Sequence, residues 1–580
     1  METFFELRAK ATRQLSLKMS LSEVKEAGDL SQYDVGTMRA IRESQGNLLM
    51  VSAFLISIFI LPLSYDPVST PKQYLLSALT LLSIGFILLF REFQLREFNN
   101  NFGKLISLFL ILLVINVFIN NYAISERIFG VSGRSTGLFT YALLTLFALI
   151  VYQSVQVKSL LFWLLLSKTG VEIYTLVQYF GIDPLEFENF YSAPSSTLGN
   201  PNFVSGFVGF AAITSIGIWF YFRNWFGAIL TVIALSLDFA VLLISQSTQG
   251  FVALGASFFL FIFIFILKSW KIKKSPKLIV LVTFLIVFGL FLLIFSPLTR
   301  GYLFSSTLFS RFDYWRAGIR MLLSNPFFGV GLDGYGDHYR MHRDQSAINR
   351  FGEGQTADAA HNVFIDFFAS GGFPLGIVYL ILVFYGAIRV IREVRASQGV
   401  NLNLIMVLAI WAGFQVQSFV SINQIGIAIW GWTLIGVMAA VGKEKTEKVN
   451  LKVNKIKSSR RAKSLLGILI ILLSWLPALS PLSRDAKFLA LAKEADGLGL
   501  KQLVTSWPKD SARMIFVAQG LGNAGLGPES LSVITDGNQH NPNNYQLWEM
   551  LAKNSNASPL QKNLAVREMK RLDPLVVPKS

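Results

Sequence analysis

Long apolar segments recur through most of this chain, and they restrict its fold more than any other feature. Each is roughly sixteen to twenty residues long, which is enough to cross a lipid bilayer as a helix. Inside a bilayer the backbone polar groups must bond within their own segment, so segments of this kind form helices. We therefore predict an all-α polytopic membrane protein with about thirteen transmembrane helices, at residues 48–64, 74–90, 105–122, 138–154, 159–180, 203–222, 227–245, 251–267, 278–296, 372–390, 403–421, 426–442 and 465–481.

Basic residues are distributed unevenly, and their positions predict the orientation in the membrane. The net charge is +17, but five lysines lie between 268 and 277, and nine Lys or Arg lie between 443 and 463. Loops on the cytoplasmic side carry such an excess. We expect a multi-pass protein of the cytoplasmic (inner) membrane, with its N-terminus cytoplasmic and its C-terminus extracytoplasmic. The same distribution argues against a nucleic-acid partner and favours contacts with membrane lipids.

The predicted spans divide the chain into three parts. Residues 1–47 form a cytoplasmic N-terminal segment, and residues 48–484 form the membrane domain with one large extracytoplasmic loop at 298–371. Residues 485–580 form a small extracytoplasmic tail, polar and helical in pattern. The tail segment at 541–574 resembles one tetratricopeptide-type helix pair, which would suit protein binding. Any small helical cap is the alternative, because one such repeat cannot bury its own face.

The loop at 298–371 has a composition that points to chemistry. It contains three of the four histidines, His338, His342 and His361, and no lysine. Arginine grips phosphate oxygens in a planar, bidentate manner, and histidine is readily poised as a base near neutral pH. The loop also contains seven arginines: Arg300, Arg311, Arg316, Arg320, Arg340, Arg343 and Arg350. This composition predicts chemistry on a phosphorylated substrate at the membrane surface.

Metal chemistry has little support in the sequence. The chain has no cysteine, which excludes a disulfide, a thiolate nucleophile and a zinc–thiolate site. His338 and His342 are four residues apart, the spacing of two metal ligands on a helix, but Asp337 is the only carboxylate immediately beside them. We expect neither a metal nor another cofactor.

Several motifs, taken in their order along the chain, resemble those of the O-antigen ligase and polymerase superfamily of membrane glycosyltransferases (the Wzy_C type), whose fold is GT-C-like. The resemblance covers about residues 48–442. An outward arginine motif and an Asn-Pro-Asn entry to a middle span support it. The matching stretches are 129–137, 199–203, 310–318, 325–331, 360–362 and 371–372.

This resemblance implies an activity and a set of site residues. It implies a glycan donor linked to undecaprenyl diphosphate, and transfer to a lipid, glycan or protein acceptor on the outer side of the membrane without a metal. This would serve polysaccharide or lipopolysaccharide biosynthesis in the cell envelope. His361 takes the position of the catalytic histidine, and Asn362 would hold its ring or the acceptor. The donor diphosphate would be bound by Arg134, Arg311, Arg316 and Gln249, the last in place of an arginine found in many members.

Each of these roles has a structural alternative. His361 and Asn362 at a helix start could be a capping pair. Arg311 could pair with Asp313 or a lipid headgroup, and Arg134 could be an interfacial anchor. Arg316 and Arg320, four apart on a predicted helix, could equally form a solvated face.

Other activities are also compatible with the sequence. A polymerase of the same superfamily, or an enzyme that glycosylates protein, would use the same donor chemistry. A transporter or flippase of lipid-linked sugars would need charged residues within its spans. Lys168 and Glu172, four apart, are expected to pair with each other, whereas Asp238 has no evident partner.

Overall fold

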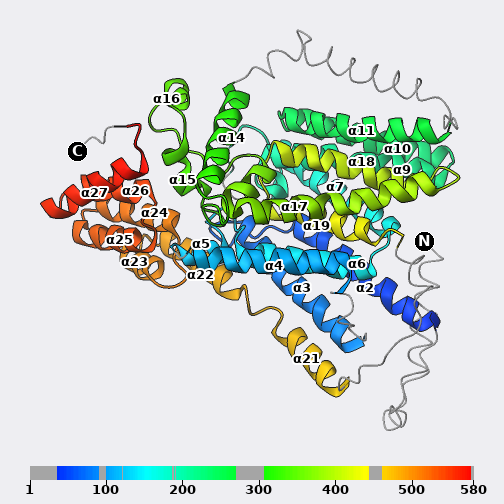
Figure 1. Cartoon of the computed structure of the whole chain (residues 1–580), viewed down its shortest axis with the longest axis horizontal. Helices are drawn as coiled ribbons and strands as arrows, with labels where there is room; N and C mark the ends of the chain where they lie inside the picture. Colours follow the sequence, from blue (N-terminus) through cyan, green and yellow to red (C-terminus); the bar gives the residue numbers. More distant parts are fainter. Residues whose placement is uncertain are drawn as a thin grey trace.

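A computed structural model of the chain describes residues 35–90, 99–120, 122–185, 189, 191–269, 306–442 and 460–576. Throughout these ranges the regular structure is helical, with no strand (Figure 1). The helices are α2 (Val35–Ile58), α3 (Ser69–Phe90), α4 (Asn101–Ile119), α5 (Ile124–Phe129), α6 (Leu138–Ser154), α7 (Val157–Tyr179), the 3-10 turn η4 (Ser196–Leu198), α8 (Pro201–Ala211), α9 (Ile213–Phe222), α10 (Trp225–Ile244), α11 (Thr248–Ser269), α14 (Ser306–Ser324), α15 (Tyr335–His342), α16 (Gln345–Phe351), α17 (Val363–Ala396), α18 (Leu402–Phe419), α19 (Ile425–Ala440), α21 (Arg460–Leu473), α22 (Leu479–Lys493), α23 (Gly497–Thr505), α24 (Ser511–Asn523), α25 (Gly527–His540), α26 (Tyr545–Lys553) and α27 (Pro559–Leu572).

Within the described ranges, eight helical segments are long and apolar enough to cross a membrane, counting α8 and α9 as one. The others are α3, α4, α7, α10, α11, α17 and α18, and three shorter apolar helices lie at Leu138–Ser154, Ile425–Ala440 and Lys463–Leu473. The predicted span at 278–296 lies outside the described residues. The helical structure is consistent with a multi-pass membrane protein, and the number of thirteen spans stays a prediction.

Several predicted span boundaries were wrong, each where a local backbone feature interrupts or extends an apolar run. The first span stops at Ile58 instead of residue 64. The span predicted at 203–222 agrees with the apolar segment Pro201–Phe222, within which α8 and α9 meet at Ala212. The span at 465–481 is divided between α21 and α22. The span predicted at 372–390 begins earlier, at Val363, and continues through a kink.

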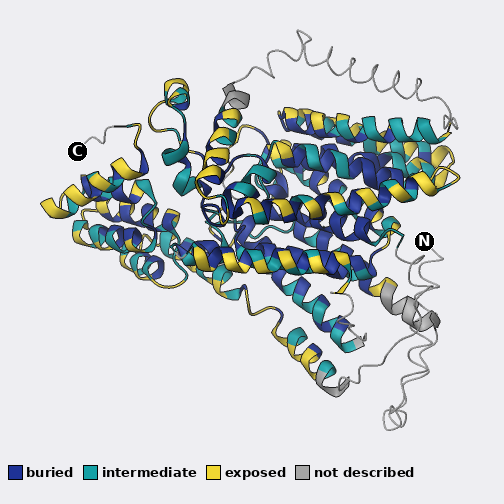
Figure 2. Cartoon of the chain, in the orientation of Figure 1, coloured by how far each residue is buried: buried dark blue, intermediate teal, exposed yellow. Residues whose placement is uncertain are grey.

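Exposed apolar side chains lie in stripes along the outer helices of the bundle. Ile377, Ile381, Phe384 and Ile388 of α17 are all exposed, and their spacing of three and four residues places them on one helix face. Exposed residues also follow the outer faces of α4, α10 and α11 (Figure 2). A stripe of this kind is costly in water but matches the acyl chains of a bilayer.

Glycines allow the loop after α14 to cross α17 at very close range. Gly372 has a φ of 70° at the kink of α17, a conformation that favours glycine. The backbone N–H of Phe373, freed by this kink, donates to the carbonyl of Pro326 at 2.7 Å, and that of Val330 donates to Ala369 at 2.9 Å. A Cβ atom on Gly329 would lie 2.4 Å from the Ala369 carbonyl oxygen. Gly329 and Gly372 therefore both allow the backbone of this loop to pack directly against the backbone of α17.

Helices α22 to α27 form the tail, at the left of Figure 1. The helix pair predicted at 541–574 is present as α26 and α27, and the pair α24 and α25 precedes it. Trp548, Leu551, Ala565 and Leu572 share one buried cluster with side chains of the preceding helices. Neighbouring helices thus cover the face that a single pair would leave open.

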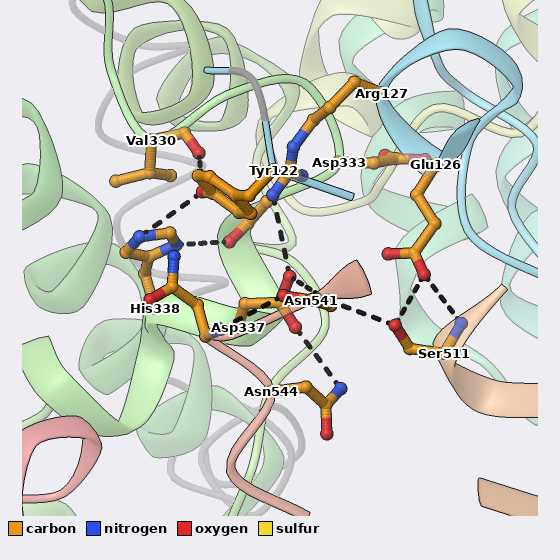
Figure 3. A network of polar contacts seen from close by, with 12 residues as sticks. Tyr122, Glu126, Arg127, Val330, Asp333, Asp337, His338, Ser511, Asn541 and Asn544 are labelled. Atoms are coloured by element: carbon orange, nitrogen blue, oxygen red, sulfur yellow. Dashed lines mark hydrogen bonds and ion pairs between the residues drawn. The ribbon is translucent and has the colours of Figure 1, made fainter. Parts of the chain in front are cut away.

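A buried polar network joins the tail to the membrane domain and to the loop helix α15 (Figure 3). Arg127 of α5 is fully buried and lies 3.6 Å from Asp337 of α15. Asp337 also accepts hydrogen bonds from two tail amides, Asn541 at 3.0 Å and Asn544 at 3.4 Å. Because one carboxylate is shared by three segments, we infer that the tail fixes the position of α15.

A second contact between the tail and the loop is ionic and buried. Asp573, just after α27, pairs with Arg343 at 2.5 Å and with Arg340 at 3.0 Å. The side chains of Asp573 and Arg343 are 1% and 0% exposed. Removing one partner of such a pair leaves an uncompensated charge out of water.

We predict that Asp573→Asn lowers the free energy of unfolding by about 3 kcal/mol, because Arg343 is left buried without its counter-ion. Thermal unfolding of the detergent-solubilised protein measures this, together with the rate of proteolysis between α16 and α17. Asp344→Asn is the matched control, since Asp344 also pairs with two arginines but on an exposed surface. It should cost less than about 1 kcal/mol. Equal effects of the two changes would contradict a stabilising role that depends on burial of the Asp573–Arg343 pair.

Candidate active site

The loop between α5 and α6 carries Arg134, and Asp333 fixes that loop. The Asp333 carboxylate accepts hydrogen bonds from the Val131 backbone at 3.1 Å and the Thr136 hydroxyl at 2.8 Å. It also lies 3.5 Å from the Arg134 guanidinium. Arg134 in turn donates to the carbonyl of Asp358 at 2.5 Å. Arg134 is thus held against the segment that precedes α17 and is not a free interfacial anchor.

His361 and Asn362 directly precede α17. The side-chain oxygen of Asn362 accepts hydrogen bonds from the backbones of Phe364 and Ile365 at 3.0 and 3.1 Å, so Asn362 is the N-cap of this helix. Asn362 is fully buried and its oxygen is engaged by this cap, whereas its amide nitrogen has no hydrogen-bond partner. A contact of this amide with the ring or the acceptor stays a prediction. His361 has a φ of 50°, a left-handed conformation that costs energy in a residue with a Cβ atom.

The imidazole of His361 lies between an aromatic ring and a carboxylate. The Tyr314 ring of α14 is 5.6 Å from it, and an oxygen of Asp358 is 3.9 Å from Nε2. Burial lowers the pKa of His361, Asp358 opposes this shift, and Arg311 and Arg134 add to it. His361 is therefore neutral near pH 7, the state in which it can accept a proton.

Arg311 of α14 is a partly buried cation near His361. Within the described residues its guanidinium makes no hydrogen bond or ion pair, and burial lowers its pKa, which starts so high that the group stays charged. The alternative that Arg311 pairs with Asp313 was wrong. Asp313 instead accepts a hydrogen bond from Nε of Arg350 at 3.2 Å.

The other loop arginines are engaged elsewhere. Arg300 lies outside the described residues. Five of the remaining six are in ion pairs: Arg316 and Arg320 with Asp344, Arg340 and Arg343 with Asp573, and Arg350 with Asp313. The side chain of Arg316 is 55% exposed and pairs with Asp344, and its predicted donor contact stays a prediction. Arg311 is the one left without such a partner in the described part of the loop.

Gln249 lies at the start of α11, which packs against α8 and α18. Its side chain is buried beside Gly206 and close to Gln417, and neither of its amide atoms has a hydrogen-bond partner. The structure brings Arg134, Arg311 and His361 close together. Gln249, in contrast, lies between α11 and the helices α8 and α18. A contact between Gln249 and the donor diphosphate stays a prediction, and none of the residues named beside Gln249 is a predicted diphosphate ligand.

His338 and His342 are on α15, as their spacing predicts. The Nδ1–H group of each donates to the carbonyl four residues earlier, at 2.9 Å in each case. Burial lowers the pKa of His338 to about 3. The part of the chain that the structure describes contains no group of three side chains suited to hold a metal ion.

Four residues of the site were not predicted from the sequence. Asp333 orients Arg134 from a distant loop, and no local pattern connects the two. Tyr314 and Asp358 had a weak signal, because each lies three residues from a predicted site residue, Arg311 or His361. Asp366 supports the same turn by accepting the backbone N–H of Ala360 at 2.7 Å.

The fold and this site define a multi-pass helical membrane protein in which Arg134 and Arg311 lie near His361 at one end of the helical bundle. Residues 233–380 match the family model described as O-antigen ligase, which confirms the resemblance drawn from the motifs. The match begins within α10, ends within α17, and includes Arg311 and His361. No curated protein matches the chain.

Proposed function

We propose that this chain is a membrane glycosyltransferase of the O-antigen ligase type. It would move a glycan from an undecaprenyl-diphosphate carrier to a lipid, glycan or protein acceptor on the outer side of the cytoplasmic membrane. The observation that carries this proposal is the pairing pattern of the loop arginines. Five of them neutralise carboxylates, whereas Arg311 lies without an ion-pair partner beside a neutral histidine.

The chemistry needs two functions at one place. The acceptor hydroxyl must lose its proton as its oxygen attacks the anomeric carbon of the donor, and the His361 imidazole would take that proton. The bond from the anomeric carbon to the diphosphate oxygen breaks, and the bonding electrons leave with the diphosphate. Arg311 and Arg134 would stabilise the charge that develops there. Asp358, 3.9 Å from Nε2, would stabilise the resulting imidazolium.

The position of the site suits a substrate anchored in lipid. His361 stands directly before α17, whose exposed apolar stripe would face the acyl chains. A polyprenyl chain could lie along that stripe while its diphosphate remains at the surface. The tail contacts the same end of the bundle through Ala123, Asp337 and Arg343. These contacts support the proposal that the loop and tail share one side of the membrane, the extracytoplasmic side.

The donor class can be tested with matched lipids. The purified protein in nanodiscs should transfer a glycan from a diphosphate-linked polyprenyl donor and leave the monophosphate-linked analogue essentially unused, because the second phosphate supplies the contacts for two arginines. Equal use of both donors would contradict binding of the donor diphosphate by the two arginines. Movement of the donor between leaflets of a vesicle, without transfer, would instead support a flippase.

We predict that the acid limb of the pH–rate profile lies below the ordinary histidine pKa of about 6.5. His361 works as a base when it is unprotonated, and burial, Arg311 and Arg134 lower its pKa. Arg311→Ala should therefore move the acid limb of the residual activity toward higher pH, and Asp358→Asn should move it toward lower pH. Profiles of kcat for the three proteins measure this, and unchanged limbs would argue against His361 as the titrating group.

A further inference from the structure

Three ionisable side chains meet inside the helical bundle, away from the candidate active site. Lys168 and Glu172 lie four apart on α7, and the Lys168 Nζ atom is 3.0 and 2.9 Å from the two Glu172 oxygens. Asp238 of α10 also accepts a hydrogen bond from Lys168. The other oxygen of Asp238 accepts one from the Ser215 hydroxyl of α9 at 2.8 Å. Asp238, which had no evident partner in the sequence, is therefore the third member of a cluster.

This cluster is closed off from water and from other charges. The side chains of Lys168 and Glu172 are fully buried, and that of Asp238 is 4% exposed. Of the elements packed against α7, helices α8, α9, α18 and α19 and the turn η4 contain no charged residue, and α10 contains only Asp238. The charged residues of α2 all precede Gln45, in its first turns. Lys168 and Asp238 are accordingly the charged neighbours of Glu172.

Formal charges in the cluster do not balance. One ammonium and two carboxylates sum to one negative charge, and burying an unbalanced charge in an apolar bundle is strongly unfavourable. One additional positive charge restores neutrality. A metal cation does not suit this position, because the Lys168 ammonium already occupies the space between the two carboxylates.

We propose that Lys168, Glu172 and Asp238 form an intramembrane proton-binding site, in which the two carboxyl groups together hold one proton. The site is independent of the transfer chemistry and lies between α7, α9 and α10. Asp238 is one of only four buried residues of α10, with Gly227, Val241 and Leu242. The bound proton therefore helps to hold α10 against α7, and its release would leave a repulsive negative charge at that contact.

Infrared spectroscopy of the purified protein tests this directly, because a protonated carboxyl group has its own carbonyl stretching band. The difference spectrum between the parent and Glu172→Gln at neutral pH should contain this band, and so should that between the parent and Asp238→Asn. Either amide leaves Lys168 with one carboxylate and removes the need for the proton. Ser215→Ala, which removes one hydrogen bond but no charge, should keep the band.

A further variant and a titration keep the proposal testable if an amide variant does not fold. Lys168→Met removes the ammonium, so both carboxyl groups should become protonated and the band should grow about twofold. Raising the pH of the parent should remove the band and lower the thermal midpoint together. Retention of the parent band in either amide variant would overturn the proposal, as would absence of the band from the parent. Loss of the band on replacing potassium by sodium at constant ionic strength would overturn it in favour of a sodium site.

Discussion

Replacing His361 by alanine should reduce glycan transfer by about 10²–10⁴-fold, the contribution typical of a positioned general base. Burial and two nearby arginines lower the pKa of the imidazole, which favours the neutral form that can take the acceptor proton. The variant should still insert and bind the donor, because the arginines remain. Product formed from a carrier-linked glycan measures the loss, with protein abundance in the membrane determined in parallel.

His342→Ala is the control for this result. His342 lies on the same loop and is also partly buried, but its ring bonds to the backbone of α15 and not to the site. Transfer by this variant should stay close to that of the parent. Activity of His361→Ala comparable with that of His342→Ala would remove the general base from the mechanism.

Replacing Arg311 by alanine should lower kcat by about 10²–10³-fold, since one preorganised donor to the developing charge is lost. Arg311→Lys should recover only part of this activity, because lysine restores the charge but not the planar, bidentate contact. The measurement is kcat and KM for the diphosphate-linked donor. Full recovery with lysine would indicate a general electrostatic role.

Arg316→Ala is the matched control on the same helix. Arg316 lies five residues from Arg311 on α14, but its guanidinium is solvated and paired with Asp344. Its loss should leave kcat nearly unchanged. A loss equal to that of Arg311→Ala would mean that overall positive charge on α14, and not the position of Arg311, serves the donor.

Apolar length and periodicity predicted most of the bundle. The predicted helix at 138–154 has the same ends in the structure, and the predicted ends of α7, α10 and α11 agree with the structure within a few residues. The failures have local causes. α17 begins nine residues before the predicted start because a separate helical stretch, from Val363, precedes the kink at Gly372, and the first span ends early, at Ile58.

The site could be predicted only where motif residues are also neighbours in space. Arg134, Arg311 and His361 are gathered by loops that converge at one end of the bundle. Arg316 shares the helix of Arg311 but points to solvent, and which face is buried depends on α17, far along the chain. The pairings Arg343–Asp573 and Lys168–Asp238 likewise depend on packing between distant segments, which periodicity does not encode.

The most direct test of the proposed activity is a reconstituted reaction with the purified protein, an undecaprenyl-diphosphate-linked glycan and a candidate acceptor. Released undecaprenyl diphosphate and glycosylated acceptor are quantified together. We expect both to appear in equal amounts with the parent protein, neither to appear without acceptor, and His361→Ala to form neither while still binding the donor. Undiminished formation of both products by His361→Ala would contradict the role of His361 as the base of the transfer reaction.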